Sequence, residues 1–364
     1  MRVIISGGGT GGHIYPAIAI AQKLQANIEK CHILYVGIAG GPEEKIAAKY
    51  GYDFRPIEGM GLPRKINKRF FKALSKNMRG FKAAKKVIKE FKPDIAIGTG
   101  GYVCGPIIYQ AANAKVPTIV HESNSYPGVT SKFLSKKVDY VCISYPQAKK
   151  HFKYKDNIVV TGNPVRTNFK DSFSDDDLKN LSIKKDRPVV FSFGGSNGSQ
   201  ALNKAVIELS RILVDEFYLL HQTGKLHYDK FNKDVSDNPY IKTYSYIDNI
   251  DLFYSVSDLV IASSGAMSLA EISAVKKPSI LVPKAYTTEN HQQYNAQTYV
   301  DNDAALMILE KNLDGKILYD DIISIINDKE KLANMGEAAG KLADKGAGDK
   351  ILDLVLELIK KDAK

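Results

Sequence analysis

One pattern of hydrophobic and polar positions recurs along the chain of 364 residues. A short run of apolar residues is followed by a glycine-rich turn and then by apolar residues at helical spacing. The pattern opens the chain at residues 3–16, VIISGGGTGGHIYP, and returns in segments that begin at Pro93, Arg187 and Ser257. Such alternation is typical of parallel sheets with helices on both faces. The pattern therefore predicts an α/β chain with doubly wound parallel sheets.

The length predicts two domains, because one hydrophobic core rarely organises so long a chain. The opening segment and the segment at Arg187 are typical of the first strands of two separate domains. A polar segment with Pro164 lies between them and is typical of a crossing between domains. We expect an N-terminal domain at 1–163 and a C-terminal domain at 164–345. A last helix at about 346–361 is expected to pack back onto the N-terminal domain.

Composition excludes several classes of protein. Apolar residues make up 44% and charged residues 25% of the chain, which is ordinary globular usage. No run of 18 apolar residues could span a bilayer, and the short apolar run before the first glycines does not suit a signal peptide. Cys31, Cys104 and Cys142 are odd in number and widely spaced. They predict reduced thiols in the cytosol, and neither a disulfide framework nor a zinc site.

The positive charge is concentrated in one segment. Residues 64–92 hold twelve lysines or arginines and one acidic residue, Glu90, so this segment alone carries the net charge of +11 of the whole chain. Its apolar residues recur every three or four positions and predict a basic amphipathic helix. Such a helix suits an anionic membrane surface. The alternative is an apolar stripe packed into the core beneath a solvated basic face.

We expect packing for the second half of this helix, near Ile88, and membrane contact for its first half. Gly80 is expected to break the helix between the two halves. The residues expected at the membrane are Phe70, Phe71, Leu74, Lys68, Arg69 and Lys72. Nucleic acid is not expected as a partner, because the rest of the chain has no basic excess and no recognition motif.

Two glycine turns, at 7–12 and at 194–198, predict a phosphorylated ligand. Glycines after a buried strand let the backbone present N–H groups to an anion, and the next helix adds its positive end. Two such turns facing one another would hold the ligand in a cleft between the domains. Dinucleotide binding is the rival. However, GGGTGGH lacks a clean G-x-G-x-x-G, and the expected acidic residue after the next strand is absent.

Seven motifs then point to a family. They are, in chain order, GGGTGGHIYPAIAIA, GGYVCGP, HESN, GNPVR, GGSNGSQALN, SGAMSLAE and ENHQQYNA. In order and spacing they resemble the MurG family of bacterial cell-wall glycosyltransferases. This resemblance implies the GT-B fold, in which two Rossmann-like domains face each other across a cleft. It also implies an inverting transfer of N-acetylglucosamine (GlcNAc) from UDP-GlcNAc to the 4-hydroxyl of N-acetylmuramic acid (MurNAc) in lipid I, which gives lipid II in peptidoglycan synthesis.

The resemblance implies that the C-terminal domain holds the donor, UDP-GlcNAc. Glu271 would accept hydrogen bonds from the ribose hydroxyls, with helix capping as the alternative role, and Ile247 would contact uracil through its backbone. The other donor contacts implied are Arg166 and Ser196 at the diphosphate, Ala266, Met267 and Ser268 beside phosphate and sugar, and Gln292 and Gln293 at the sugar hydroxyls.

The N-terminal domain is implied to hold the acceptor, lipid I, which is undecaprenyl-pyrophosphoryl-MurNAc-pentapeptide. The residues implied at the acceptor or donor sugar are Thr10, Gly11, Gly12, His13, Tyr102, Glu122 and Asn124. Backbone N–H groups of residues 8–12 suit the acceptor's diphosphate. His13 suits the catalytic base, since a helix N-terminus keeps its ring neutral. The alternative for His13 is a hydrogen bond that braces the loop or a phosphate.

No tightly bound metal or other cofactor is expected, because neither acidic run, at 175–177 or 301–303, follows a predicted strand. A helix end and Arg166 would neutralise the leaving diphosphate instead. The lipid acceptor implies a peripheral position at the cytoplasmic face of the membrane. Two other functions stay open. One is a transferase of the same fold that uses diacylglycerol, and the other is a non-catalytic nucleotide-binding protein, which would not explain SLAE and HQQYNA together.

Overall fold

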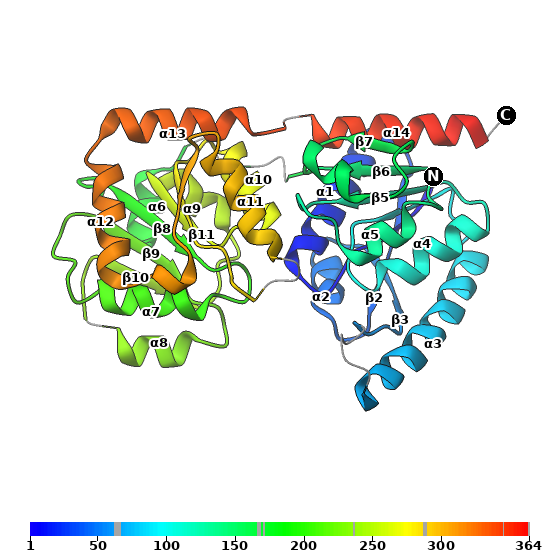
Figure 1. Ribbon diagram of the computed structural model, residues 1–364, viewed down its shortest axis with the longest axis horizontal. Coiled ribbons are helices and arrows are strands. Elements are labelled where there is room, and N and C mark those ends of the chain that lie inside the picture. Colours follow the sequence, from blue (N-terminus) through cyan, green and yellow to red (C-terminus); the bar gives the residue numbers. More distant parts are fainter. Residues whose placement is uncertain are drawn as a thin grey trace. The chain divides into compact units, whose positions relative to one another are not determined.

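The computed structural model describes residues 1–61, 67–165, 169, 172–235, 237–286, 290–344 and 346–362. Contacts divide the chain into two compact units (Figure 1). Unit 1 comprises Met1–Val165 and Asp344–Lys364, and unit 2 comprises Arg166–Ala343. The chain thus crosses between the units twice, and its last segment belongs to unit 1.

Unit 1 contains a seven-stranded parallel sheet in the order β3-β2-β1-β4-β5-β6-β7. Its strands are β1 (Arg2–Ser6), β2 (His32–Ile38), β3 (Asp53–Ile57), β4 (Ile95–Gly98), β5 (Thr118–Glu122), β6 (Tyr140–Ile143) and β7 (Ile158–Val160). Its helices are α1 (Gly11–Asn27), α2 (Pro42–Lys49), α3 (Lys68–Phe91), α4 (Cys104–Asn113), α5 (Val129–Leu134), the 3-10 helix η1 (Pro146–His151) and α14 (Ala347–Asp362). The strand order reverses between β1 and β4, so the sheet is doubly wound.

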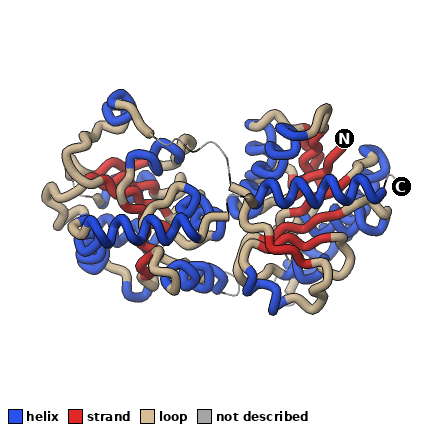
Figure 2. Tube along the Cα trace, turned by 90° about the horizontal axis from the view of Figure 1, so that it is seen from above, coloured by secondary structure: helices blue, strands red, loops and turns tan. Residues whose placement is uncertain are grey.

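Each face of this sheet is covered by its own apolar cluster. On one face Ile14 and Ile18 of α1 share a cluster with Ile351 and Val355 of α14. On the other, residues of α3 and α4 pack against the strands. Figure 2 shows the strands of the sheet enclosed by helices. The last helix of the chain is therefore part of the core of unit 1.

Unit 2 contains a six-stranded parallel sheet in the order β10-β9-β8-β11-β12-β13. Its strands are β8 (Val189–Phe193), β9 (Tyr218–Gln222), β10 (Ile241–Tyr244), β11 (Leu259–Ala262), β12 (Ser279–Leu281) and β13 (Ala305–Met307). Its helices are α6 (Asp175–Asn180), α7 (Gln200–Leu209), α8 (Tyr228–Asp234), α9 (Ile250–Val256), α10 (Ala266–Ala274), α11 (His291–Val300), the 3-10 helix η3 (Glu310–Asn312), α12 (Gly315–Ile326) and α13 (Lys329–Lys341). Two doubly wound parallel domains are thus confirmed.

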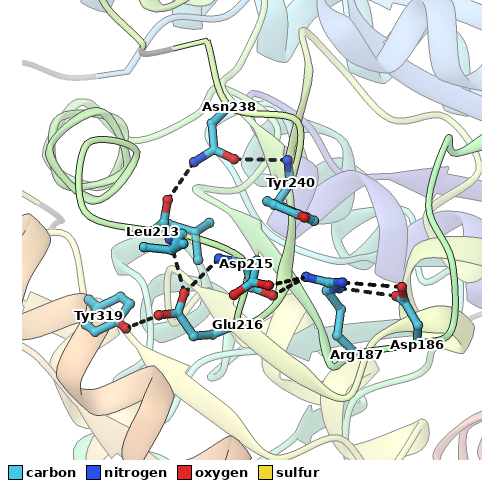
Figure 3. A network of polar contacts seen from close by, with 9 residues as sticks. Asp186, Arg187, Leu213, Asp215, Glu216, Asn238, Tyr240 and Tyr319 are labelled. Atoms are coloured by element: carbon cyan, nitrogen blue, oxygen red, sulfur yellow. Dashed lines mark hydrogen bonds and ion pairs between the residues drawn. The ribbon is translucent and has the colours of Figure 1, made fainter.

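The amino edge of the unit 2 sheet is braced by a polar network (Figure 3). Arg187, just before β8, pairs with Asp186 and Asp215 and lies 4.5 Å from the ring centroid of Tyr240. Tyr319 of α12 donates a hydrogen bond of 2.8 Å to Glu216. These charged groups find their partners within the protein, so the network has a structural role. The residues expected at the donor lie at the opposite, carboxyl edge of the sheet.

Helix α3 is continuous over its 24 residues, so the expected break at Gly80 is wrong. Gly80 is buried, and a Cβ atom there would lie 2.0 Å from the carbonyl oxygen of Glu58. Arg79 adds two hydrogen bonds of 2.8 Å to the carboxylate of Glu58. The glycine therefore allows the loop after β3 to approach the helix closely.

The two halves of α3 differ in burial. Ala84, Val87 and Ile88 are buried in the core, as expected for the second half. In the first half, the exposed fractions of Phe71 and Met78 are 61% and 59%. Among the described residues, no helix has the length and apolar character needed to cross a membrane.

Candidate functional site

The expected acceptor residues lie at the carboxyl edge of the unit 1 sheet. Thr10 to His13 follow β1, Tyr102 follows β4, and Glu122 and Asn124 lie at and after the end of β5. These three strands are neighbours, and the strand order reverses between β1 and β4. Open α/β sheets bind their ligands at such a reversal. The fold therefore brings all of these residues to one edge.

The turn after β1 interlocks with the turn after β4. Gly100 and Gly101 have positive φ angles of +103° and +80°. A Cβ atom on Gly100 would lie 2.6 Å from Nδ1 of His13, and one on Gly101 would lie 2.4 Å from the carbonyl oxygen of Gly8. Larger residues would push the two turns apart. The glycines of TGGY are thus required to seat His13.

The surroundings of His13 fix the proton on its ring. Its Nδ1 lies 3.1 Å from the carbonyl oxygen of Thr99, and the Thr99 hydroxyl donates to the carbonyl of His13 at 2.6 Å. A carbonyl oxygen can only accept, so Nδ1 carries the proton. In the neutral ring Nε2 then holds the lone pair, as a general base requires. His13 lies in the first turn of α1, whose N-cap Thr10 makes no side-chain cap.

A buried carboxylate contacts the first glycine turn. Glu43, the second residue of α2, is 1% exposed and accepts hydrogen bonds from the N–H groups of Gly9 at 3.2 Å and Ile38 at 3.0 Å. The N–H of Gly9 is therefore occupied, so fewer of the backbone N–H groups of residues 8–12 remain for the expected contact with the acceptor's diphosphate. Burial and the charge of Glu43 also raise the pKa of Tyr102. Sequence reasoning missed Glu43, because a glutamate after Gly-Gly-Pro gives no sign of this distant contact.

Glu122 shapes the loop that follows it. Its carboxylate is 3% exposed and accepts hydrogen bonds from the backbone and side-chain N–H groups of Asn124, both at 3.0 Å, and from the N–H of Gly128 at 2.9 Å. These hydrogen bonds fix the position of Asn124, whose side chain is only partly buried. Glu122 thus orients Asn124 and contacts the loop up to Gly128.

The expected donor residues lie at the carboxyl edge of the unit 2 sheet. Ser196 follows β8, Ile247 follows β10, and α10 and α11 follow β11 and β12. The strand order reverses between β8 and β11, which is again the position of a ligand site. Ser196 is exposed in the second glycine turn. Arg166 lies outside the described residues.

Helix α10 directs its N-terminus to this edge. Ala266, Met267 and Ser268 form its first turn, after the N-cap Gly265. Glu271 lies one turn further on, inside the helix, so the helix-capping alternative is wrong. Its side chain is 6% exposed and accepts a hydrogen bond of 3.3 Å from the hydroxyl of Tyr254.

Gln222 connects two parts of the expected donor site. Its amide nitrogen donates to the carbonyl oxygen of Gly195 at 3.1 Å, and its amide oxygen accepts from the N–H of Ile247 at 2.8 Å. The N–H of Ile247 is therefore occupied, and a uracil ring would meet its carbonyl oxygen. Sequence reasoning missed Gln222, whose only signal is a polar residue at the end of a buried strand.

The amides of Gln292 and Gln293 are also oriented by the protein. The side-chain oxygen of Gln292 accepts from the N–H of Lys284 at 3.0 Å, and that of Gln293 accepts from the side chain of Asn290 at 2.7 Å. Their amide N–H groups are thus the part that each could offer to a sugar hydroxyl. Lys284 was not among the predicted residues.

In the described ranges the potential metal-binding side chains are dispersed, and two of the thiols are buried. Within them, no group of three His, Cys, Asp or Glu side chains is placed to hold a metal ion. Cys104 and Cys142 are buried and free, and burial raises the pKa of each to about 12. A surface pocket of about 410 Å³, lined by Asp303, Asp328 and Lys331 among others, contains none of the expected site residues.

Comparison with known proteins identifies the family. The model of the glycosyltransferase family 28 N-terminal domain matches residues 3–143, and that of the family 28 C-terminal domain matches residues 189–351. The chain belongs to glycosyltransferase family 28. The N-terminal model lies within unit 1, and the C-terminal model covers most of unit 2 and the first residues of the last segment, which belongs to unit 1.

Curated family 28 relatives match the whole chain. A protein of Finegoldia magna is 45% identical over 100% of both chains, and one of Clostridioides difficile is 42% identical over 98% of this chain and 89% of the other. Both are named UDP-N-acetylglucosamine–N-acetylmuramyl-(pentapeptide) pyrophosphoryl-undecaprenol N-acetylglucosamine transferase. The resemblance carried by the seven motifs is confirmed.

Solved structures agree. MurG of Acinetobacter baumannii superposes with a TM-score of 0.75 and 25% identity, covering 98% of this chain and 99% of that one. A UDP-GlcNAc 2-epimerase from Neisseria meningitidis, bound to UDP-GlcNAc, gives a TM-score of 0.69 at 13% identity, with 98% and 100% covered. The epimerase shares the fold alone. The GT-B architecture is confirmed.

Proposed function

We propose that the protein transfers N-acetylglucosamine from UDP-GlcNAc to the N-acetylmuramyl group of lipid I. One observation carries this proposal, namely the 45% identity to the Finegoldia magna transferase over the full length of both chains. The diacylglycerol acceptor is not favoured, because the relatives are named for the muramyl acceptor. Family 28 membership also argues against a non-catalytic nucleotide-binding protein.

In this proposal unit 2 binds the donor. Glu271 takes the ribose hydroxyls, the carbonyl of Ile247 takes uracil, and the second glycine turn with Ser196 takes the diphosphate. The N-terminus of α10 stabilises the negative charge that grows on the leaving diphosphate. The placement of these groups after strands β8, β10 and β11, at one edge of the same sheet, supports the assignment.

Unit 1 binds the acceptor, and His13 is the base. Nε2 of His13 takes the proton of the 4-hydroxyl, the hydroxyl oxygen forms the new bond to C1 of GlcNAc, and UDP leaves with the bonding electron pair. The configuration at C1 inverts because attack and departure occur on opposite faces. The hydrogen bond from Nδ1 to Thr99 supports this role, since it leaves the lone pair on Nε2.

The lipid acceptor requires contact with a membrane, and we propose that the first half of α3 makes it at the cytoplasmic face. Phe71 and Leu74 are 61% and 45% exposed, beside the exposed side chains of Lys68, Arg69 and Lys72. On α5, Val129 and Phe133 are 76% and 47% exposed, and Phe133 stacks on Tyr109, which contacts Phe81 of α3. Exposed apolar groups with basic neighbours supply both signals for reversible membrane binding.

The decisive experiment is transfer of labelled GlcNAc from UDP-GlcNAc to a short-chain analogue of lipid I. Diacylglycerol serves as the competing acceptor in a parallel assay. We expect a labelled disaccharide product with the first acceptor and none with the second. Transfer to diacylglycerol alone would contradict the proposal.

A further inference from the structure

Lys284 touches both halves of the expected donor site. It lies in the segment between β12 and α11. Its side-chain ammonium donates a hydrogen bond of 2.7 Å to the carbonyl oxygen of Gly198, in the second glycine turn. Its backbone N–H donates to the side-chain oxygen of Gln292 at 3.0 Å. One residue therefore links the turn expected at the diphosphate with the amide expected at the sugar.

The link crosses the point where the sheet order reverses. Gly198 follows β8 and Lys284 follows β12, and β11 lies between these strands. The side chain of Lys284 thus spans the end of the strand that leads into α10. A phosphate group is expected at this position in an open α/β sheet.

The second glycine turn depends on such external contacts for its shape. Gly195 and Gly198 have φ angles of +77° and +74°. A Cβ atom on Gly198 would lie 1.9 Å from the carbonyl oxygen of Thr223, so the turn is pressed against the loop after β9 on one side. Gln222 holds the carbonyl of Gly195, and Lys284 holds that of Gly198. Both ends of the turn are therefore fixed by side chains from other strands.

Glu310 completes the arrangement. Its carboxylate accepts hydrogen bonds from the N–H of Ala285 at 3.0 Å and from the hydroxyl of Ser199, the N-cap of α7, at 3.4 Å. The half-buried ammonium of Lys284 has its pKa lowered by burial, and the charge of Glu310 opposes that effect. The acid and the lysine thus hold adjacent residues, Ser199 and Gly198, at the start of α7.

We propose that Lys284 is a positioning residue for the donor, which holds the second glycine turn in the shape that receives the diphosphate of a nucleoside diphosphate sugar. This inference rests on the proposed function of unit 2. Without the ammonium the turn loses one of its two side-chain ties, and the backbone expected to face the diphosphate is held at the Gly195 end alone. The positive charge beside the turn is lost as well.

The test measures binding of UDP, UMP and uridine by calorimetry to the full-length protein and its variants. Lys284→Met removes the ammonium but keeps the backbone N–H that holds Gln292. We expect UDP to bind about tenfold more weakly to this variant, since a hydrogen bond from a charged group is lost. Uridine affinity should stay unchanged, because uracil and ribose contact other residues. Lys284→Arg keeps the charge and should recover most of the UDP affinity.

Lys311→Met is the matched control, because Lys311 is an exposed lysine next to Glu310 in sequence. It should bind UDP as the wild type does. In the transfer assay, Lys284→Met should raise the KM for UDP-GlcNAc by the same factor as the Kd for UDP, with little change in kcat. If the role of Lys284 were merely structural, Lys284→Met would instead lower the thermal midpoint and weaken the binding of uridine as much as that of UDP.

Two results would overturn the inference, namely wild-type affinity of Lys284→Met for UDP and an equal loss of UDP and uridine affinity. A different result would overturn the proposed function alone. In that case the wild type binds UDP, Lys284→Met shows the selective loss, and no GlcNAc reaches the lipid I analogue. Calorimetry and transfer thus test the two proposals separately.

Discussion

His13 and Glu271 illustrate how single residues acquire chemical roles from their surroundings. The ring of His13 is oriented by Thr99 and confined by Gly100, where a side chain would collide with it. Glu271 is almost fully buried, and a hydroxyl from α9 contacts its carboxylate. A buried carboxylate favours ligands that donate hydrogen bonds to it, because unpaired charge is costly away from water. Each role leads to a kinetic prediction.

Replacing His13 by Ala should lower kcat by roughly 10² to 10⁴, which is the usual contribution of a general base. The Kd for UDP should not change, because the donor residues belong to unit 2. Single-turnover transfer and calorimetry measure the two quantities. His32→Ala is the control, since His32 is an exposed histidine of the same unit that pairs with Asp53. Near-normal turnover of His13→Ala would reduce the residue to a brace of the loop.

Replacing Glu271 by Ala should lower kcat/KM for UDP-GlcNAc by about 2 to 4 kcal/mol, mainly through KM, because a buried charged partner of the ribose is lost. Initial rates over a range of donor concentrations measure this effect. Glu330→Ala, at an exposed glutamate of α13, should behave as the wild type. Unchanged donor kinetics in Glu271→Ala would remove the residue from the donor site.

At the scale of elements, local sequence patterns predict those strands, turns and helix ends that are determined by residues close together in the sequence. The repeat of strand, glycine turn and helix correctly predicts β1, β4, β8 and β11, because burial and turn chemistry are local. The acidic run at 175–177 forms the first turn of α6, where Ser174 and Asp177 make a capping box. Acidic side chains stabilise a helix N-terminus, so this run has a structural role.

Contacts between distant segments escape the same reasoning. Gly80 suggests a helix break, but a glycine is needed there because the carbonyl oxygen of Glu58, in the loop after β3, approaches the helix closely. Glu43 in α2, Gln222 at the end of β9 and Lys284 in the loop after β12 each form a hydrogen bond with a glycine turn. Nothing in their local sequence encodes these partners, because the fold alone brings them together. The expected residues of the site could be named from motifs, whereas the residues that contact them could not.

Gly80 provides a test at this scale. Alanine is favoured over glycine in a helix by roughly 1 kcal/mol. Gly80→Ala should nevertheless destabilise unit 1, because its Cβ would lie 2.0 Å from the carbonyl oxygen of Glu58. Thermal unfolding should show a lower midpoint for Gly80→Ala than for the wild type. The control, Ser75→Ala on the exposed face of the same helix, should not lower the midpoint in this way. A higher midpoint for Gly80→Ala would contradict the close approach.

At the scale of the whole molecule, two units of similar design divide the proposed work. Each is a parallel sheet with a glycine turn after its first strand, and each reverses its strand order beside that turn. The two units differ in charge, since the segment at 64–92 holds the whole excess of positive charge of the chain. Part of that segment is α3 of unit 1. Unit 1, which we propose binds the acceptor, is thus also the unit suited to an anionic surface.

This asymmetry predicts how the enzyme reaches a lipid substrate. Each basic residue near an anionic membrane contributes on the order of 1 kcal/mol, and the attraction is screened within a Debye length of about 8 Å at physiological salt. Cosedimentation with vesicles should therefore increase with anionic lipid content and decrease with salt. Changing Lys68, Arg69, Lys72 and Lys76 of α3 to Glu should abolish it, while transfer to a soluble acceptor analogue continues.

The control must change the net charge equally without touching α3. Four exposed lysines of unit 2 serve, namely Lys230, Lys233, Lys329 and Lys341, each changed to Glu. If α3 is the docking element, this variant keeps vesicle binding, because the attraction depends on where the charge lies and on the exposed apolar groups beside it. Equal loss in both variants would show that net charge alone drives binding. Binding that ignores lipid charge would instead make α3 a packed helix with a solvated face.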